Sequence, residues 1–141
     1  MSDSVTNGVQ AIEKTSRILT ALQDLEGAGI TELADELAYS KSTVHHHLTT
    51  LREEGLVTKR DGEYHLGIRL FEFGAFARRQ RDIYTAGKPE VDALAEETGE
   101  LANLMIAENG KGVYIHIGAG EDAVNLDTST GTVQYLHACA I

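Results

Sequence analysis

Residues 40–53 combine an apolar repeat with a cluster of short polar and histidine side chains. The segment reads Ser-Lys-Ser-Thr-Val-His-His-His-Leu-Thr-Thr-Leu-Arg-Glu. At about 100° per residue of an α-helix, Val44, Leu48 and Leu51 would share one side, and short polar groups would occupy the other. Small hydrogen-bonding side chains near the N-terminus of such a helix can meet base edges in the major groove of DNA. The polar side alone would equally fit an ordinary solvated helix.

The segment that follows favours the DNA-binding interpretation. Residues 56–60 and 63–66 are β-prone and flank Asp61-Gly62, a pair that readily adopts the positive φ angles of a type I′ turn. Pairing Arg60 with Glu63 places Val57, Lys59, Tyr64 and Leu66 on one face. Lys59 and Arg60 would then lie at the tip of a hairpin wing, where they could contact the phosphate backbone.

Two helices must precede this segment to cover its apolar side. Ile12, Ile18, Leu19, Leu22 and Leu25 recur at helical spacing, and Gly27 and Gly29 end the pattern. Thr31 is a suitable N-cap for a short second helix, whose apolar residues are Leu33, Ala34 and Leu37, and Ser40 is the expected N-cap of the third helix, which ends at Gly55. Three helices and a basic-tipped hairpin predict a winged helix-turn-helix. The residues expected to contact DNA are Thr31, Ser40, Lys41, Ser42, Thr43, His45, His46, Thr49, Lys59 and Arg60.

The remainder of the chain is expected to be mixed α/β. Leu70, Phe73 and Ala77 indicate a connecting helix over 68–84 that ends in arginines, and Pro89 suits the first turn of another helix ending at Gly99. Residues 102–107 and 113–117 flank Asn109-Gly110, a hairpin signal, and residues 123–126 indicate a further strand. The fold class is therefore α+β.

Charge and composition limit the alternatives. The chain has 141 residues and a net charge of −10, from 12 basic and 22 acidic residues. Residues 1–81 carry ten basic and twelve acidic side chains, a net of −2, so most of the acidity lies outside the expected DNA-binding part. An acidic surface is typical of a protein from a halophile, whose cytoplasm is salty. The acidity would also suit a winged helix used for protein–protein contacts rather than DNA.

Other functional classes find little support. Consecutive residues on a helix point about 100° apart, so His45, His46 and His47 cannot converge on one metal ion. The single cysteine, Cys139, can form no intrachain disulfide. No cofactor or catalytic motif is recognisable, and Tyr114, His116 and Asp127 are the only nearby polar candidates for an enzyme. Without a signal peptide or a long apolar run, the expected location is the cytoplasm, with no membrane contact.

The sequence resembles the IclR-type transcriptional regulators from Val9 to Ile141. The similar stretches include Arg17-Ile18-Leu19, Thr31-Glu32-Leu33-Ala34, Ser40-Lys41-Ser42-Thr43-Val44-His45, Arg52-Glu53-Glu54-Gly55-Leu56-Val57, Tyr64-His65-Leu66-Gly67-Ile68-Arg69-Leu70 and Leu136-His137-Ala138. Positions 46 and 47, often Arg and an apolar residue in that family, are both His here. The resemblance implies a metabolite-controlled regulator that binds operator DNA as a homodimer or dimer of dimers.

The resemblance also implies a division of the chain. Residues 8–67 would form the DNA-binding domain, 68–84 a linker helix that contributes to dimerisation, and 85–141 the first part of a GAF-like effector-binding domain. The chain stops where the family's effector loop should begin, so we expect a truncated domain. Tyr135, Ala140 and Ile141 are the candidate contacts to a small organic effector, whose binding would shift the two DNA-binding domains relative to each other.

Overall fold

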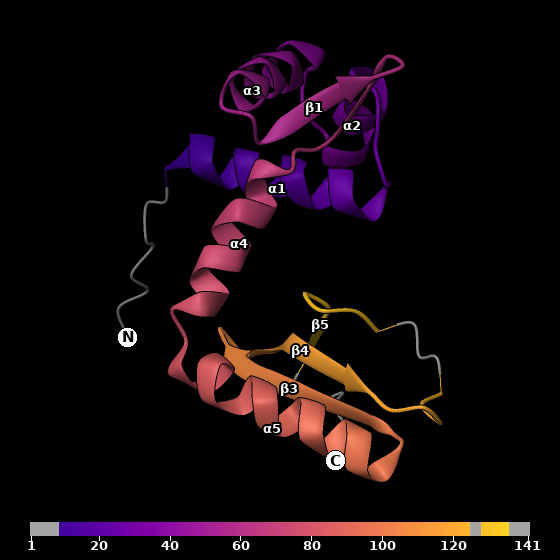
Figure 1. Cartoon of the computed structure of the whole chain (residues 1–141). Coiled ribbons are helices and arrows are strands. Elements are labelled where there is room, and N and C mark those ends of the chain that lie inside the picture. Colours follow the sequence, from indigo (N-terminus) through magenta and orange to yellow (C-terminus); the bar gives the residue numbers. More distant parts are fainter. Residues whose placement is uncertain (1–8, 125–127, 136–141) are drawn as a thin grey trace, which may run out of the picture. The chain divides into compact units, whose positions relative to one another are not determined.

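The first part of the chain forms three helices and a hairpin. The computed structural model describes residues 9–124 and 128–135 and divides into two units, Met1–Phe73 and Gly74–Ile141. In the first unit, α1 spans Gln10–Asp24, α2 Ile30–Leu37 and α3 Lys41–Glu53, followed by the strands β1 (Val57–Arg60) and β2 (Glu63–Leu66) (Figure 1). The six largest fully buried side chains of this unit are Ile18, Leu22, Leu33, Leu48, Val44 and Val57. These elements and their shared core confirm the predicted winged helix-turn-helix.

The junctions between the helices differ in one respect from the sequence-based expectation. Ser40 caps α3 as predicted, because its side chain accepts a hydrogen bond from the backbone N–H of Thr43. Thr31, however, is not the N-cap of α2. The helix begins at Ile30, and Gly29 occupies the cap position with extended backbone and no side-chain hydrogen bond. Burial of the half-exposed Ile30 against the core outweighs the capping preference of Thr31.

The hairpin has the predicted register and turn. Arg60 pairs with Glu63, and Val57 pairs with Leu66. Asp61 and Gly62 have φ angles of 52° and 89°, the positive values that a type I′ turn requires. Tyr64 extends this small sheet by an isolated bridge to Ala28, with hydrogen bonds in both directions at 2.9 and 3.0 Å. The loop between α1 and α2 is thereby fastened to the wing.

The connecting helix is shorter than predicted. α4 spans Arg69–Arg79, and a second helix, α5, begins at Asp82 and continues to Thr98, so the expectation of one helix over 68–84 is wrong. Arg81 interrupts the helical path with extended backbone (φ −91°, ψ 114°). Pro89 lies inside α5 rather than in its first turn. Packing of α5 on the sheet, with Ala95 buried, maintains the helix in spite of the hydrogen bond that proline cannot donate.

The second unit is completed by an antiparallel sheet of order β3-β4-β5. β3 spans Leu101–Glu108, β4 Lys111–Ala119 and β5 Val133–Tyr135, and α5 lies along the β3–β4 pair (Figure 1). Asn109 and Gly110 form the predicted turn, with φ angles of 50° and 74°. Ala123 and Val124 are not in a strand, contrary to the expectation for 123–126, and the last two of those positions lie outside the described residues. The strand β5 was not predicted.

The architecture as a whole is α+β, as predicted. In the part of the chain that the structure describes, no helix combines the length and the apolar character needed to cross a membrane.

Candidate nucleic-acid interface

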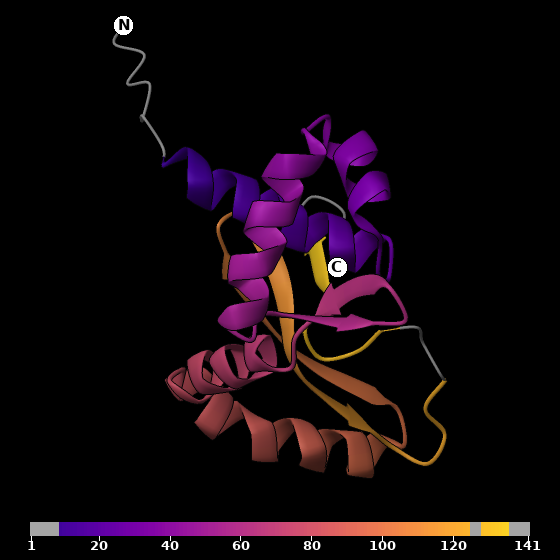
Figure 2. The same cartoon turned by 90° about the horizontal axis from the view of Figure 1, so that it is seen from above.

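The polar side of α3 is open to solvent. Val44 and Leu48 are fully buried on its inner side, whereas Ser42, His45 and His46 are exposed. The rings of His45 and His46 meet edge to face, with centroids 6.1 Å apart. Figure 2 shows α3 leading directly into the hairpin within the first unit. The side chains predicted to face DNA therefore lie on the accessible surface of the helix.

The N-terminus of α3 is arranged to accept an anion. Ser40 Oγ accepts from the Thr43 N–H at 3.1 Å and lies 2.8 Å from Thr43 Oγ1. The amides of Lys41 and Ser42 donate no hydrogen bond to any atom of the described residues. Unpaired amides at a helix N-terminus carry the positive end of the helix dipole and bind phosphate readily. The exposed Lys41 adds a full positive charge at the same place.

Two further residues of α3 have internal roles. The half-buried Thr49 donates from Oγ1 to the carbonyl of His45 at 2.9 Å, so its hydroxyl can only accept from a base or a phosphate donor. His47 Nδ1 lies 3.1 Å from Thr15 Oγ1 and connects α3 to α1. His47 thus lies at the edge of the packed face of α3.

The wing tip carries two exposed cations. Lys59 and Arg60 are both solvent-exposed, and the Lys59 Nζ lies 5.1 Å from the centroid of the Tyr64 ring. Tyr64 is 5% exposed, so this ring is a fixed platform for the flexible lysine. Neither cation forms an ion pair with an acidic side chain of the described residues. Both charges remain available to an external anion.

Thr31 stands apart from the other predicted contacts. It is exposed in the first turn of α2, and it lines a shallow depression together with Glu32, Asp35 and Glu36. Three carboxylates around one hydroxyl make a poor surface for phosphate. Its assignment as a DNA contact remains a prediction.

The sequence reasoning missed three residues beside the start of α3. Lys14 Nζ and Arg17 Cζ lie 5.8 Å and 5.3 Å from the centroid of the Tyr39 ring. Tyr39 directly precedes the capping residue Ser40. The spacing of Lys14 and Arg17 was a signal in the sequence, because residues three apart share one face of a helix. Their aromatic partner, Tyr39, lies on a separate segment, so its contact with them could not be predicted.

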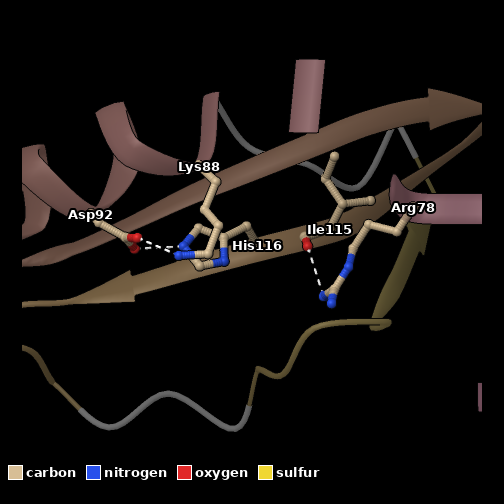
Figure 3. A network of polar contacts seen from close by, with 5 residues as sticks. All are labelled: Arg78, Lys88, Asp92, Ile115 and His116. Carbon is tan, nitrogen blue, oxygen red and sulfur yellow. Dashed lines mark hydrogen bonds and ion pairs between the residues drawn. The ribbon is translucent and has the colours of Figure 1, made fainter. Parts of the chain in front are cut away.

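A polar network connects α4 and α5 to β4 in the second unit. His116 Nε2 lies 2.6 Å from Asp92 Oδ1, and Lys88 Nζ donates to Asp92 Oδ2 at 2.7 Å (Figure 3). The hydrogen bond from Lys88, followed by that from His116, holds the pKa of Asp92 below its ordinary value, and the same bond to Asp92 raises the pKa of Lys88. Arg78 donates to the carbonyl of Ile115 at 3.3 Å.

Of the predicted effector contacts, only Tyr135 lies within the described residues. Tyr135 is 59% exposed on β5, and Lys111 Nζ lies 5.5 Å from the centroid of its ring. Ala140 and Ile141 lie outside the described residues. A surface depression of this unit lies elsewhere, where α5 ends and β4 leaves the sheet, and its lining includes five carboxylates: Asp92, Glu96, Glu97, Glu121 and Asp122. Within the described ranges no three His, Cys, Asp or Glu side chains are grouped so that they could hold a metal ion.

Comparison with known proteins identifies both parts of the chain. Residues 11–61 match the IclR helix-turn-helix domain, and residues 75–141 match the C-terminal domain of bacterial IclR transcriptional regulators. The chain is 32% identical over 124 residues to a probable HTH-type transcriptional regulator, ArcR, of Halobacterium salinarum, covering 87% of this chain and 46% of that protein.

Solved structures agree with this assignment. An IclR-type transcriptional regulator from Alicyclobacillus acidocaldarius is similar, with a TM-score of 0.74 and 26% identity over 92% of this chain and 54% of the other. An IclR homolog from Microbacterium hydrocarbonoxydans, solved with 4-hydroxybenzoate, shares the fold at a TM-score of 0.65 and 19% identity, covering 91% and 54% of the two chains. The chain spans about half the length of these relatives. Since the two family domains follow each other here as they do in these proteins, the chain belongs to the IclR family of transcriptional regulators.

Proposed function

We propose that this chain binds operator DNA in a sequence-specific manner and belongs to a regulator of transcription controlled by a small organic metabolite. The observation that carries the proposal is the open polar side of α3, with Ser42, His45 and His46 exposed above a fully buried Val44 and Leu48. A recognition helix needs this combination, because its apolar side must be held by the domain while its polar side enters the major groove.

The proposed contacts fall into two classes. Ser42, His45, His46 and Thr49 face the groove and would read base edges, because their side chains are short and can donate or accept hydrogen bonds. The phosphate contacts are Lys41, the N-terminus of α3, where Ser40 and Thr43 form the cap, and the wing cations Lys59 and Arg60. Phosphate contacts position the helix, and base contacts select the sequence.

We propose that DNA binding and effector binding lie in different parts of the chain, and the division of the structure into two units supports this. We assign DNA binding to residues 8–67 and effector binding to the part that begins with α5 at Asp82, with α4 as the connector between them. Tyr135, Ala140 and Ile141 are the proposed effector contacts. A homolog of this fold was solved with 4-hydroxybenzoate, which supports a small organic ligand for the present protein.

A homodimer or a dimer of dimers is the proposed assembly. α4 contains no buried residue, and Phe71, Phe73 and Phe76 on it are 66%, 50% and 58% exposed. Large aromatic side chains gathered on one solvent-exposed helix indicate a surface that a second copy covers. Two DNA-binding domains held in this way would meet two half-sites of one operator, and effector binding would change whether they match.

We place the protein in the cytoplasm of a halophile. Chromosomal DNA, its proposed partner, lies in the cytoplasm of prokaryotes, and a relative comes from Halobacterium salinarum. The net charge of −10 fits a salt-rich medium, where carboxylates keep a surface hydrated. Thermal stability that rises from low to molar salt is the expected result, and an equal melting temperature across that range would refute the halophilic assignment.

The experiment that tests DNA binding is titration of a labelled duplex from the region upstream of the protein's own gene. Lys41→Ala, Ser42→Ala and Arg60→Ala should each weaken binding, whereas Lys111→Ala, a cation on the second unit, should not. Ser42→Ala should also change the preference among operator variants, because it alters the groove side of α3. Unchanged binding in all three variants would refute the DNA interface and favour a protein partner for the winged helix.

A further inference from the structure

The strongest further feature is a pair of cations held on one aromatic ring. Lys14 Nζ lies 5.8 Å and Arg17 Cζ lies 5.3 Å from the centroid of the Tyr39 ring. The two cations are three residues apart on α1 and therefore share a face of that helix. Tyr39 is half-buried and packs against the hydrophobic core of the first unit. The ring is thus a fixed platform, and it lies one residue before the N-cap of α3.

The ring positions the two charges without neutralising them. An aromatic face attracts a cation through its quadrupole and leaves the net charge in place, whereas a carboxylate partner would cancel it. Neither Lys14 nor Arg17 forms an ion pair with any acidic side chain of residues 9–124 and 128–135. Two like charges close to one ring also repel each other. Both positive charges therefore remain available to an external anion.

The chemistry of the neighbouring atoms identifies that anion. The amides of Lys41 and Ser42, at the positive end of α3, donate to no acceptor in the described part of the chain. Arginine and lysine are the usual protein ligands of phosphate, and amides at a helix N-terminus bind the same group. Lys14 and Arg17 lie over the ring of Tyr39, which is followed directly by Ser40 and Lys41 at the start of α3.

We propose that Lys14 and Arg17 bind the phosphate backbone of DNA beside the recognition helix, with Tyr39 as the residue that positions both cations. We name this set of three residues the α1 clamp. The inference rests on the proposed DNA binding by α3 and adds a contact from α1 to it. Because a phosphate carries no sequence information, the clamp contributes equally to operator DNA and to unrelated DNA.

The salt dependence of binding tests the α1 clamp directly. Each phosphate contact contributes about 0.9 to the slope of log affinity against log salt concentration on duplex DNA. The double variant Lys14→Gln/Arg17→Gln should therefore lower that slope by about two. Over a fourfold rise in salt concentration, the full chain should lose about 12-fold more affinity than the double variant. The measurement is made on an upstream duplex and on an unrelated duplex, within the salt range where circular dichroism shows both proteins folded.

Three further variants separate the clamp from general charge effects. Lys111→Gln removes a cation on the second unit whose Nζ lies 5.5 Å from the centroid of the Tyr135 ring. This variant should leave the slope unchanged. Tyr39→Phe keeps the ring and should bind as the parent does. Tyr39→Leu removes the ring while leaving both cations, and it should weaken binding less than the double variant does.

The outcomes distinguish this inference from the proposed function. If the parent chain binds DNA and the double variant keeps the parent's slope, the α1 clamp is refuted while DNA binding stands. An equal drop in slope for Lys111→Gln would also refute it, because the effect would then follow net charge alone. If the parent chain binds neither duplex at any salt concentration, the proposed function itself is refuted, and the clamp with it.

Discussion

The start of α3 has two proposed roles: it must be a stable helix end, and it must expose free amides to phosphate. Substitutions at Ser40 can separate these two roles. Ser40 Oγ accepts from the Thr43 N–H at 3.1 Å, and this is the side-chain cap of the helix. Ser40→Ala removes the cap, which costs about 1 kcal/mol. Ser40→Asp keeps an acceptor at the same place and adds a negative charge at the positive end of the helix dipole. We therefore expect Ser40→Asp to be at least as stable as the parent.

The expected order of DNA affinity is the reverse of the expected order of stability, with Ser40→Asp below Ser40→Ala. A carboxylate at position 40 competes for the free amides of Lys41 and Ser42 and repels the phosphate that they would bind. We expect Ser40→Asp to lose at least about tenfold in affinity, which corresponds to about 1.4 kcal/mol. Ser40→Ala leaves those amides free and should bind DNA nearly as the parent does at temperatures where it is folded.

Two measurements check this reversal. Circular dichroism melts should place Ser40→Ala about 4–8 °C below the parent, the shift that 1 kcal/mol produces in a domain of about this size. Fluorescence anisotropy with the upstream duplex should give the weakest binding for Ser40→Asp. Thr130→Asp adds the same charge at an exposed position of the second unit and should change neither property. A Ser40→Asp variant that binds like the parent would refute the placement of phosphate at the start of α3.

Three other substitutions test the fold around the two sites. Gly67→Ala would bring a Cβ to 2.3 Å from the carbonyl oxygen of Gly55, so the wing must shift from α3. DNA affinity in the anisotropy assay should therefore fall at least about tenfold. Gly74 has open space around it, so Gly74→Ala should not change the affinity. Leu48→Ala removes a fully buried side chain and should lower the free energy of unfolding in urea by about 2–5 kcal/mol. The lowered pKa of Asp92 means that its carboxylate stabilises the folded state above the ordinary value of 3.8 and loses that effect as pH falls through the lowered pKa. The melting temperature of Asp92→Asn should therefore lie below that of the parent at neutral pH and approach it at acid pH; a gap that stays constant with pH would contradict this account.

The part of the fold that the sequence predicts is the part specified by local signals. The apolar spacing of Val44, Leu48 and Leu51, the cap at Ser40 and the stop at Gly55 define α3 within one continuous segment. The pair Asp61-Gly62 likewise fixes the hairpin turn and, with it, the register of both strands. Most side chains proposed to contact DNA lie on these elements, and for that reason their exposure follows from the sequence.

Features that depend on distant residues were not predicted. The break at Arg81 and the continuation of α5 through Pro89 follow from packing on a sheet whose strands come later in the chain. β5 has three residues and exists because it pairs with the edge of β4, so its own sequence contains no sufficient signal. The α1 clamp requires Tyr39 to approach Lys14 and Arg17. Because Tyr39 is more than twenty residues from both in the sequence, no local pattern predicts this contact.

Arg78 is another residue whose contacts depend on distant parts of the chain. From the sequence it is a favourable charge in the last turn of α4. In the structure its guanidinium donates to the carbonyl of Ile115 (Figure 3). The guanidinium also lies 4.7 Å from the ring centroid of Tyr84, and the buried Nε of Arg78 has no partner among the described residues. Ile115 has no partner on β3, since the register shifts between Leu104 and Met105, and a bulge of this kind leaves its extra residue unpaired. Arg78 therefore connects the last turn of α4 to the irregular point of β4, a contact that no local sequence pattern predicts.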